Sequence, residues 1–360
     1  MSILNKLGVR FPIIQAPMAG VSTPELAAAV SNAGGLGSIG VGATDASGAR
    51  AMIDALKQLT DRPFNVNLFV HKDPVRNPER EERWLGGLAS EFARFDARPP
   101  EHLQTIYTSF ASDPDMLDML VETRPPIVSF HFGTPGADQI AALKAAGCTL
   151  LATATNLDEG LELQAAGMDA IIAQGIEAGG HRGVFDPAKP DPALGTLALT
   201  RLLAARLDVP IIAAGGIMDG RGIAAALALG AEVAQLGTAF IACPESAADA
   251  TYRDTLLSDR ALHTEMTSAI SGRPARCMVN QFTTWGHAHR DLAPPDYPVA
   301  YDAGKALNKA AKKKGVHTFG AQWAGQGAPL ARAMPAAELV ETLAREWEAE
   351  SRSQSIVGSP

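Results

Sequence analysis

A glycine-rich segment in the middle of the chain carries a histidine that could take part in catalysis. The segment reads Gly175-Ile176-Glu177-Ala178-Gly179-Gly180-His181-Arg182-Gly183 and follows a short apolar run that ends in Gln174. Glycines let backbone amides approach a ligand closely, and a histidine can donate a proton, accept one or bind an anion. His181 is therefore the candidate catalytic residue. A histidine in an exposed surface loop is the alternative, but the flanking glycines favour a ligand site.

Two further glycine-containing segments predict a phosphate site. Gly215 and Gly216 follow the apolar run Pro210–Ala214, and Gly237 with Thr238 follows the run Glu232–Leu236. Backbone N–H groups at such loops, and the helix N-termini behind them, bind phosphate groups. One pair of glycines could serve only as a tight turn, but two such loops favour phosphate binding. They do not decide between a phosphorylated substrate and a nucleotide cofactor.

Polar side chains also stand at the ends of apolar runs, where a buried terminus would normally be apolar. The amides are Gln15, Asn67, Gln174 and Gln235. Because an amide both donates and accepts, several at one place suit the alternating polar edge of a flat heteroaromatic ring. Each amide alone could instead cap loop backbone. His131 ends another run and is either part of this site or a buried structural histidine.

The elements that must position these residues follow a repeating pattern of apolar runs and Ala/Leu-rich helical segments. This pattern is typical of βα units around a parallel sheet. Four predicted helices end at a glycine just before the next run, where positive φ turns the chain back into the sheet. The eight predicted strands are Phe11–Ala16, Leu36–Gly40, Phe64–Val70, Ile127–Phe132, Thr149–Ala154, Ala170–Gln174, Pro210–Ala214 and Glu232–Leu236. We therefore expect an α/β fold, a (β/α)8 TIM-type barrel, with its active site at the C-terminal strand ends.

Two long segments interrupt the pattern, and the second of them predicts a smaller unit beside the barrel. More than fifty residues separate the third and fourth predicted strands, and residues 243–318 lack regular periodicity. Long excursions of this kind are often lids or binding elements. We expect residues 1–242 to form the cofactor-binding barrel and residues 243–318 an inserted substrate or lid domain. Residues 319–360 would return to the barrel and end in a helix that closes it.

The composition argues against several classes of function. The net charge of −8 argues against a nucleic-acid partner or an anionic membrane surface, and the lysines near 309–314 are the only basic run. Three separated cysteines predict reduced thiols, and no metal site is predicted. With neither a signal-peptide pattern nor a long apolar stretch, we expect a cytoplasmic protein that does not enter a membrane.

Several segments together resemble the class I nitronate monooxygenases, and the resemblance covers nearly the whole chain. The matching segments are Gln15–Gly20, Ala33–Gly37, Asn65–Phe69, Phe130–Gly133, Gln174–His181, Ala213–Ile217 and Gln235–Thr238. The resemblance implies a non-covalently bound FMN. The residues that would hold it are Pro17, Met18, Asn67, Gln174, Gly179, Gly180, Gly215, Gly216, Gln235, Leu236, Gly237 and Thr238, with residues 323–327 as a further contact.

The resemblance also implies a substrate pocket made of tyrosines, two histidines and a lysine. Besides His181, the matching residues are His131, Tyr107, Tyr252, Tyr297, Tyr301 and Lys305. All four tyrosines lie in the two excursions, although tyrosines favour half-exposed positions in any protein. Tyr301 and Lys305 are one helical turn apart and so share a helix face.

The activity implied is oxidation of a small alkyl nitronate by O2 to a carbonyl compound and nitrite or nitrate. Propionate 3-nitronate is the favoured substrate, and His181 would bind the anion or remove the α-proton of a neutral nitroalkane. The first alternative is an NAD(P)H-dependent flavin reductase of the same barrel family, either a quinone reductase or a flavin-type enoyl-acyl-carrier-protein reductase. A non-catalytic flavin- or phosphate-binding module and a barrel isomerase acting on a phosphorylated substrate also remain open. We expect a monomer or a homodimer.

Overall fold

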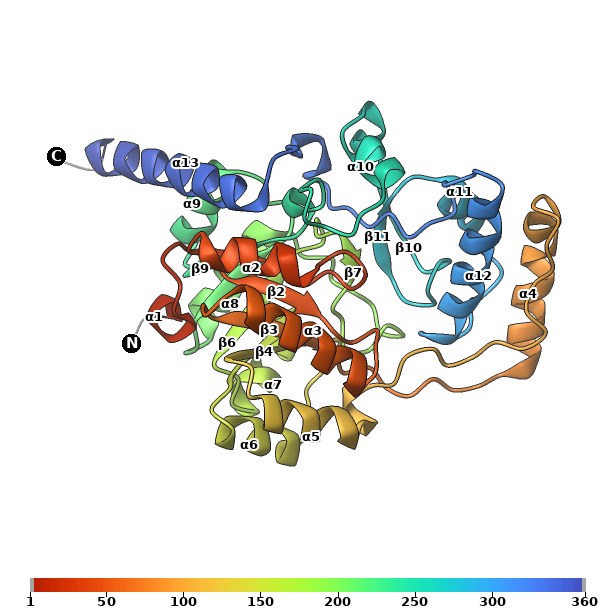
Figure 1. Ribbon diagram of the computed structural model, residues 1–360, viewed down its shortest axis with the longest axis horizontal. Coiled ribbons are helices and arrows are strands. Elements are labelled where there is room, and N and C mark those ends of the chain that lie inside the picture. The colour runs from red at the N-terminus through yellow and green to blue at the C-terminus, as the bar shows by residue number, and fades with distance from the viewer. Residues whose placement is uncertain (1–2, 358–360) are drawn as a thin grey trace.

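Short runs rich in Ile, Val, Leu and Ala form eight parallel strands in the computed structural model, which describes residues 3–357 (Figure 1). The strands are β1 (Ile13–Gln15), β2 (Gly37–Gly40), β3 (Phe64–Phe69), β4 (Ile127–His131), β5 (Thr149–Ala154), β6 (Ala170–Gln174), β8 (Ile211–Ala214) and β9 (Val233–Leu236). Their order is β1-β9-β8-β6-β5-β4-β3-β2, and a parallel bridge between Ile14 and Leu36 brings β1 beside β2. The predicted barrel and all eight of its strands are confirmed.

Eight helices surround the barrel, each with an apolar face packed on the strands. They are α2 (Pro24–Asn32), α3 (Ala46–Leu59), α5 (Pro114–Thr123), α6 (Ala137–Ala145), α7 (Leu157–Ala165), α8 (Thr196–Arg206), α9 (Gly220–Ala228) and α13 (Ala336–Val357). As predicted, glycines with positive φ follow four of these helices, at Gly34, Gly147, Gly167 and Gly230. The final helix α13 packs against α9 and α2, so it fills the eighth helix position.

The N-terminal end of the barrel is filled with apolar side chains. Helix α1 (Ile3–Leu7) places Ile3 and Leu7, both fully buried, against Ile14, Leu36 and Ile172 of the barrel interior. Because this end is packed, room for a ligand lies at the opposite end, where the strands carry their polar residues.

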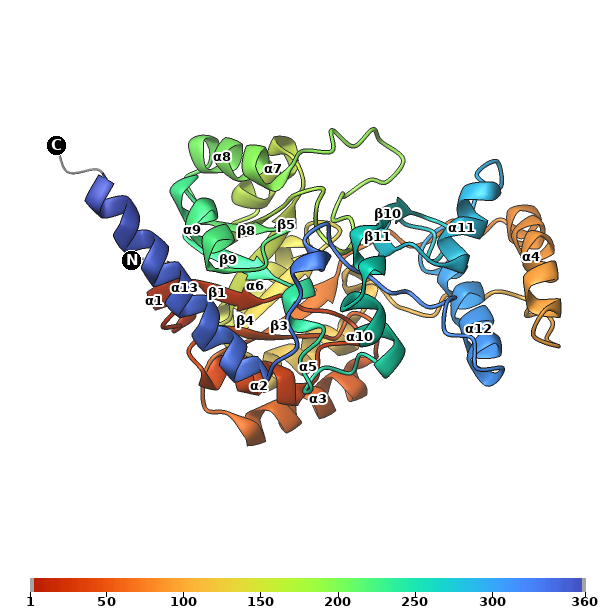
Figure 2. The same ribbon diagram turned by 90° about the horizontal axis from the view of Figure 1, so that it is seen from above.

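A smaller unit stands beside the carboxyl ends of the strands. It contains α4 (Pro78–Ala93), β7 (Gly180–His181), α10 (Ala250–Leu256), β10 (Thr264–Thr267), β11 (Ala275–Met278), α11 (Gln281–Ala288) and α12 (Val299–Lys313). Strands β10, β11 and β7 form an antiparallel sheet. Helix α4 lies beside α12 in both views (Figures 1 and 2), and Trp84 of α4 packs edge-on to Trp285 of α11. This unit therefore draws on the excursion between β3 and β4 as well as on the chain after β9.

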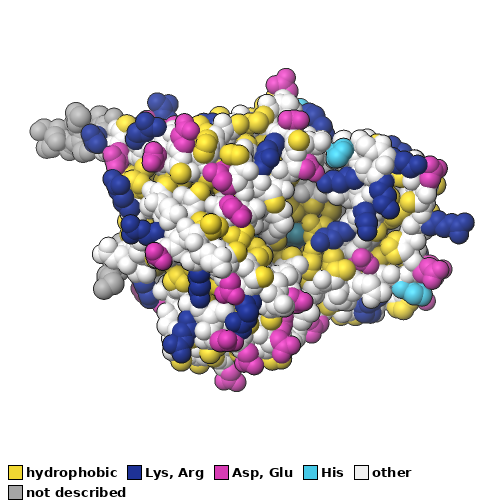
Figure 3. Space-filling model, in the orientation of Figure 1, with side chains coloured by type: hydrophobic (Ala, Val, Ile, Leu, Met, Phe, Trp, Pro, Cys, Tyr) yellow, Lys and Arg dark blue, Asp and Glu magenta, His cyan; other side chains and the backbone are white. Residues whose placement is uncertain are grey.

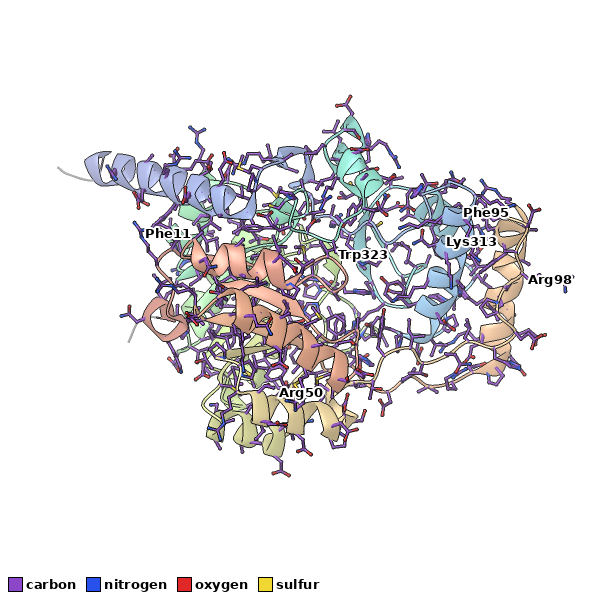
Figure 4. The ribbon with its side chains drawn as sticks, viewed as in Figure 1. Phe11, Arg50, Phe95, Arg98, Lys313 and Trp323 are labelled. Atoms are coloured by element: carbon purple, nitrogen blue, oxygen red, sulfur yellow. The ribbon has the colours of Figure 1, made fainter. Side chains whose placement is uncertain are left out.

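Strand β7 links this smaller unit to the barrel, because it belongs to the glycine-rich segment that follows β6. Its His181 pairs with Ala275 of β11. The side chain of Trp323 lies at the junction of the two parts (Figure 4). Within residues 3–357, no helix has the length and apolar character needed to cross a membrane.

Candidate active site

A cavity of about 660 Å³ lies between the carboxyl ends of the barrel strands and the smaller unit. Figure 3 shows a hollow in this region, with apolar side chains on its floor and Lys and Arg side chains along one side. The volume is in the range of small-molecule and cofactor sites. The predicted site residues that line the cavity are Pro17, Met18, Asn67, Gln174, Gly179, Gly180, Gly215, Gly216, Gln235, Gly237, Thr238, His131, His181, Tyr107, Tyr252, Tyr297, Tyr301 and Lys305.

Leu236 is the one predicted site residue that does not line this cavity. Successive side chains of a strand point to opposite faces, so Gln235 and Leu236 of β9 cannot both face the same space. The Leu236 side chain is buried among apolar residues of β1 and the surrounding helices. The Leu236 side chain therefore cannot contact a ligand in this cavity.

Backbone groups at one end of the cavity form a cradle suited to phosphate. Gly215 and Gly216 have φ of +121° and +70°, a backbone conformation that residues other than glycine rarely adopt. Among the described residues, the N–H groups of Gly216, Ile217 and Thr238 donate to no protein acceptor. Unpaired N–H groups at strand ends and before a helix are the donors that a phosphate requires.

A carboxylate that the sequence analysis did not single out holds this cradle in shape. Glu177 accepts hydrogen bonds from the backbone N (2.8 Å) and the Oγ1 (2.9 Å) of Thr196, at the start of α8. Thr196 Oγ1 also lies 2.9 Å from the carbonyl oxygen of Gly215. The glycine loop after β6 is thus tied to the loop after β8. A glutamate among glycines was the only local signal for this role.

The segment 323–327 closes the cradle from the far side. Gly325 N donates to Thr238 Oγ1 at 3.0 Å, and Gln326 N donates to the Glu177 carbonyl at 2.9 Å. A Cβ atom on Gly179 would lie 2.5 Å from Gly325 N, so the two backbones meet where only glycine fits. Trp323, Gly325 and Gly327 line the cavity.

The strand-end amides divide into two groups by their hydrogen bonds. Gln15 is fully engaged by Ser22 and Ser38, which makes it a capping amide. Gln174 donates to the His181 carbonyl (3.0 Å) and accepts from Gly183 N (2.7 Å), so it fixes the glycine-rich segment after β6. Gln235 lines the cavity with a buried Oε1 that has no partner in the described part of the chain, which leaves an acceptor for a bound ligand.

Two neutral histidines form the cavity wall between the barrel and β7. His181 Nε2 lies 2.9 Å from Ser271 Oγ, and His131 Nε2 lies 3.1 Å from the His181 carbonyl oxygen. A carbonyl only accepts, so Nε2 of His131 carries the proton. Burial lowers the pKa of His181 to about 3 and that of His131 to about 4. At neutral pH, both imidazoles can donate and accept without carrying charge.

Behind the histidines lie Phe132 and Arg273, for which the sequence predicted no role. Phe132 has φ of +82°, a strained conformation for a bulky residue, and its ring lies edge-on to His181 with centroids 5.7 Å apart. The guanidinium carbon of Arg273 lies 4.1 Å from the centroid of the Phe132 ring. Burial lowers the pKa of Arg273 to about 10. This cation contributes, after burial, to the low pKa of both histidines.

The wall that adjoins His181 consists of tyrosines and one lysine. The rings of Tyr107 and Tyr301 lie 6.1 Å apart, and Lys305 Nζ lies 4.8 Å and 5.4 Å from their centroids. Burial raises the pKa of Tyr107 to about 12, so its hydroxyl stays a neutral donor at physiological pH. Tyr297 lines the cavity with a buried hydroxyl that has no partner. Tyr252 instead donates its hydroxyl proton to the Trp323 carbonyl, so this proton is not available to a ligand.

The charges around this wall favour an anionic ligand. Within residues 3–357, Asp249 is the one carboxylate that lines the cavity, and its Oδ2 lies 2.6 Å from Lys312 Nζ. Among the residues that the structure describes, no carboxylate lies within 4 Å of Lys305, and its ammonium faces the tyrosine rings. A free cation, neutral hydroxyls and a neutral imidazole therefore surround the space in front of His181.

We expect the two histidines to make stability depend on pH. Each has a folded-state pKa far below the ordinary value of 6.5, so the unfolded chain binds protons that the folded chain does not. Their stabilising contribution is complete above about pH 6.5 and is lost as the pH falls towards 4. At pH 5, unfolding should take up close to two protons from this pair.

The measurement is the free energy of chemical unfolding between pH 5 and pH 8. The slope of this free energy against pH gives the number of protons taken up on unfolding. In His131→Asn this number should be about one lower than in the unsubstituted protein, because one of the two histidines is removed. An unchanged slope in this variant would contradict the low pKa of His131.

Comparisons with known proteins agree with this geometry. Residues 2–346 match the family model described as nitronate monooxygenase. A nitronate monooxygenase of Paraburkholderia phytofirmans is 61% identical over 96% of this chain and 94% of its own length. A nitronate monooxygenase of Pseudomonas aeruginosa is 57% identical over 94% of this chain and 97% of its own length.

A solved structure extends the likeness to the fold. The structure of a nitroalkane oxidase from Streptomyces ansochromogenes superimposes with a TM-score of 0.89 at 42% identity, covering 98% of this chain and 99% of that one. The family match spans both the barrel and the smaller unit, and it includes every residue of the cavity described above. The predicted resemblance is confirmed: the chain belongs to the nitronate monooxygenase family.

Proposed function

We propose that the protein binds FMN and oxidises small alkyl nitronates with O2, and that propionate 3-nitronate is a substrate. The products would be a carbonyl compound and nitrite or nitrate. The observation that carries this proposal is one continuous cavity with two chemically different ends. One end is a backbone cradle suited to phosphate, and the other is a pocket with a free cation and neutral donors suited to a small anion.

The residues present fit FMN. The N–H groups of Gly216, Ile217 and Thr238 would hold its phosphate, and the unpartnered Oε1 of Gln235 would accept a hydrogen bond from the ring. Pro17, Met18, Asn67, Gln174, Gly179 and Gly180 also line this part of the cavity. When bound, FMN would supply the electron transfer between substrate and O2, which no side chain can provide.

The side chains of the pocket would bind and orient the substrate anion. The Lys305 ammonium supplies the positive charge, and the hydroxyls of Tyr297 and Tyr301 supply neutral donors. The neutral His181 stands at the junction with the barrel, where it can donate to a nitronate oxygen or accept a proton. Because Tyr301 and Lys305 stand on α12 and His181 stands on β7, they would hold the anion in one orientation.

An absorption spectrum and an oxygen electrode test this proposal. The purified protein should be yellow and should consume oxygen with propionate 3-nitronate in the absence of nicotinamides. Rapid bleaching of the flavin by NADH under anaerobic conditions, without oxygen uptake on any nitronate, would instead support the flavin-reductase alternative. A colourless protein that cannot be loaded with FMN would contradict the proposal at its first step.

Removing the free cation should weaken substrate capture. We expect Lys305→Met to lower kcat/KM for propionate 3-nitronate by about tenfold, mainly through KM, because a charge-assisted hydrogen bond is lost. Lys313→Met is the matched control, since Lys313 lies at the end of the same helix and does not line the cavity (Figure 4). Equal losses in both variants would mean that general surface charge, and not the pocket, attracts the substrate.

A further inference from the structure

The cavity continues along α12 beyond the residues that a small nitronate needs. Tyr301, Gly304, Lys305, Asn308 and Lys312 all line it, and their spacing of three or four residues places them on one helix face. At 1.5 Å per residue, Asn308 lies about 10 Å along the helix axis from Tyr301. A three-carbon substrate held near Tyr301 and Lys305 would leave this extension empty.

The far end of the extension is lined by polar atoms that lack partners. Asn308 Oδ1, His317 Nδ1 and Gln322 Oε1 are all buried without a hydrogen bond within the described residues. Gln322 is only 5% exposed. A Cβ atom on Gly320 would lie 3.5 Å from Asn308 Oδ1, so the Asn308 amide packs over the segment that carries Gln322. We name Asn308, His317 and Gln322 the distal subsite.

Unpaired buried polar atoms destabilise a folded protein unless a ligand or water supplies their partners. The three atoms of the distal subsite come from α12 and from the segment 317–322, and all three residues line one cavity. Asn308 packs over Gly320, which lies between His317 and Gln322 in the chain, so the three atoms indicate a place built to meet a polar group, not a single packing defect.

The charges near the distal subsite favour an oxygen-bearing anion. Lys312 Nζ is neutralised by Asp249 at 2.6 Å, whereas Lys305 is one turn away and has no carboxylate within 4 Å in residues 3–357. The two orientations of a side-chain amide differ only in which of its O and N atoms faces the cavity, so Asn308 and Gln322 can present NH2 groups to a ligand. Donors beside a free ammonium suit a carboxylate.

We infer that the distal subsite binds the carboxylate of nitronates with longer chains, of roughly six carbons, whose reacting end lies at His181. Three bonds of an extended chain span a little under 4 Å, so three carbons more than propionate 3-nitronate cover most of the roughly 4.5 Å along α12 that separates Lys305 from Asn308. This inference rests on the proposed function and extends it from one small substrate to a class of ω-carboxy nitronates.

The test compares two substrates of equal chain length, the nitronates of 6-nitrohexanoate and 1-nitrohexane. The unsubstituted protein should show at least a tenfold higher kcat/KM for the carboxylate. Asn308→Leu and Gln322→Met keep approximate side-chain size and remove the amide. Each should lower this preference about tenfold, through KM for the carboxylate substrate. The flavin spectrum of each variant checks that the fold is retained.

Lys309→Met is the control, because it removes a neighbouring charge on α12 but does not line the cavity. It should keep the preference. Equal kcat/KM for the two substrates in the unsubstituted protein would overturn the inference. Asn308→Leu and Gln322→Met variants that keep the full preference would overturn it too, and water would then be the partner of the distal subsite. A yellow protein that consumes oxygen with no nitronate at all would refute the proposed function instead.

Discussion

Replacing His181 with Asn should lower kcat/KM for a neutral nitroalkane at least a hundredfold, and for the corresponding nitronate only about tenfold. Burial lowers the pKa of His181 to about 3, so the imidazole is unprotonated throughout the neutral range and can accept the α-proton. Asparagine can still donate a hydrogen bond to the anion, but it cannot take up that proton. The nitronate already lacks the proton, so it needs only binding and orientation.

The measurement is kcat/KM with 1-nitropropane and with its nitronate at the same pH. Ser271→Ala serves as the control, because it removes the hydroxyl that lies 2.9 Å from His181 Nε2 and keeps the imidazole. That variant should lose activity severalfold on both substrates, through poorer orientation. Equal losses on both substrates in His181→Asn would show that His181 only binds the anion and does not act as a base.

Placing a methyl group at Gly179 should weaken FMN binding at least a hundredfold. The added Cβ would lie 2.5 Å from Gly325 N and 2.6 Å from the Ala324 carbonyl carbon. Both are backbone atoms, so no side-chain rotation relieves the contact, and the two segments must move apart. That movement would displace the loop that carries Gly179 and Gly180 along the cavity. Titrating the flavin-free Gly179→Ala variant with FMN, followed by fluorescence, measures the effect.

Gly86→Ala is the matched control, since a Cβ there would meet nothing within 4 Å and Gly86 lies on α4, away from the cavity. It should bind FMN like the unsubstituted protein. Circular dichroism separates loss of the cofactor from loss of the fold. If Gly179→Ala retained full FMN affinity with an intact fold, the cofactor would have to lie elsewhere than in this cradle.

The barrel could be predicted from the sequence because its determinants are local. Runs such as Pro210–Ala214 are apolar without interruption, which indicates a strand buried on both faces. Glycines such as Gly147 and Gly167 mark helix ends through a backbone conformation that depends on a single residue. Several cavity-lining residues, such as His181, Gly215 and Gln235, were found from local patterns, although the local physics of each amide or histidine left structural alternatives open. The tyrosines and Lys305 were found by resemblance to a family. For Gln15 the structural alternative proved correct, because both ends of its amide are engaged within the protein.

The sequence by itself therefore determined the eight strands, the helix ends and the end of the barrel at which the cavity lies. Only the tertiary structure decided that Arg273 lies behind Phe132, that Glu177 ties two loops through Thr196, and that α4 joins the smaller unit. These contacts join residues far apart in the chain, so no periodicity or spacing encodes them. They form because a buried cation, a half-buried carboxylate and an apolar helix face must each find a partner, and folding alone determines which one lies within reach.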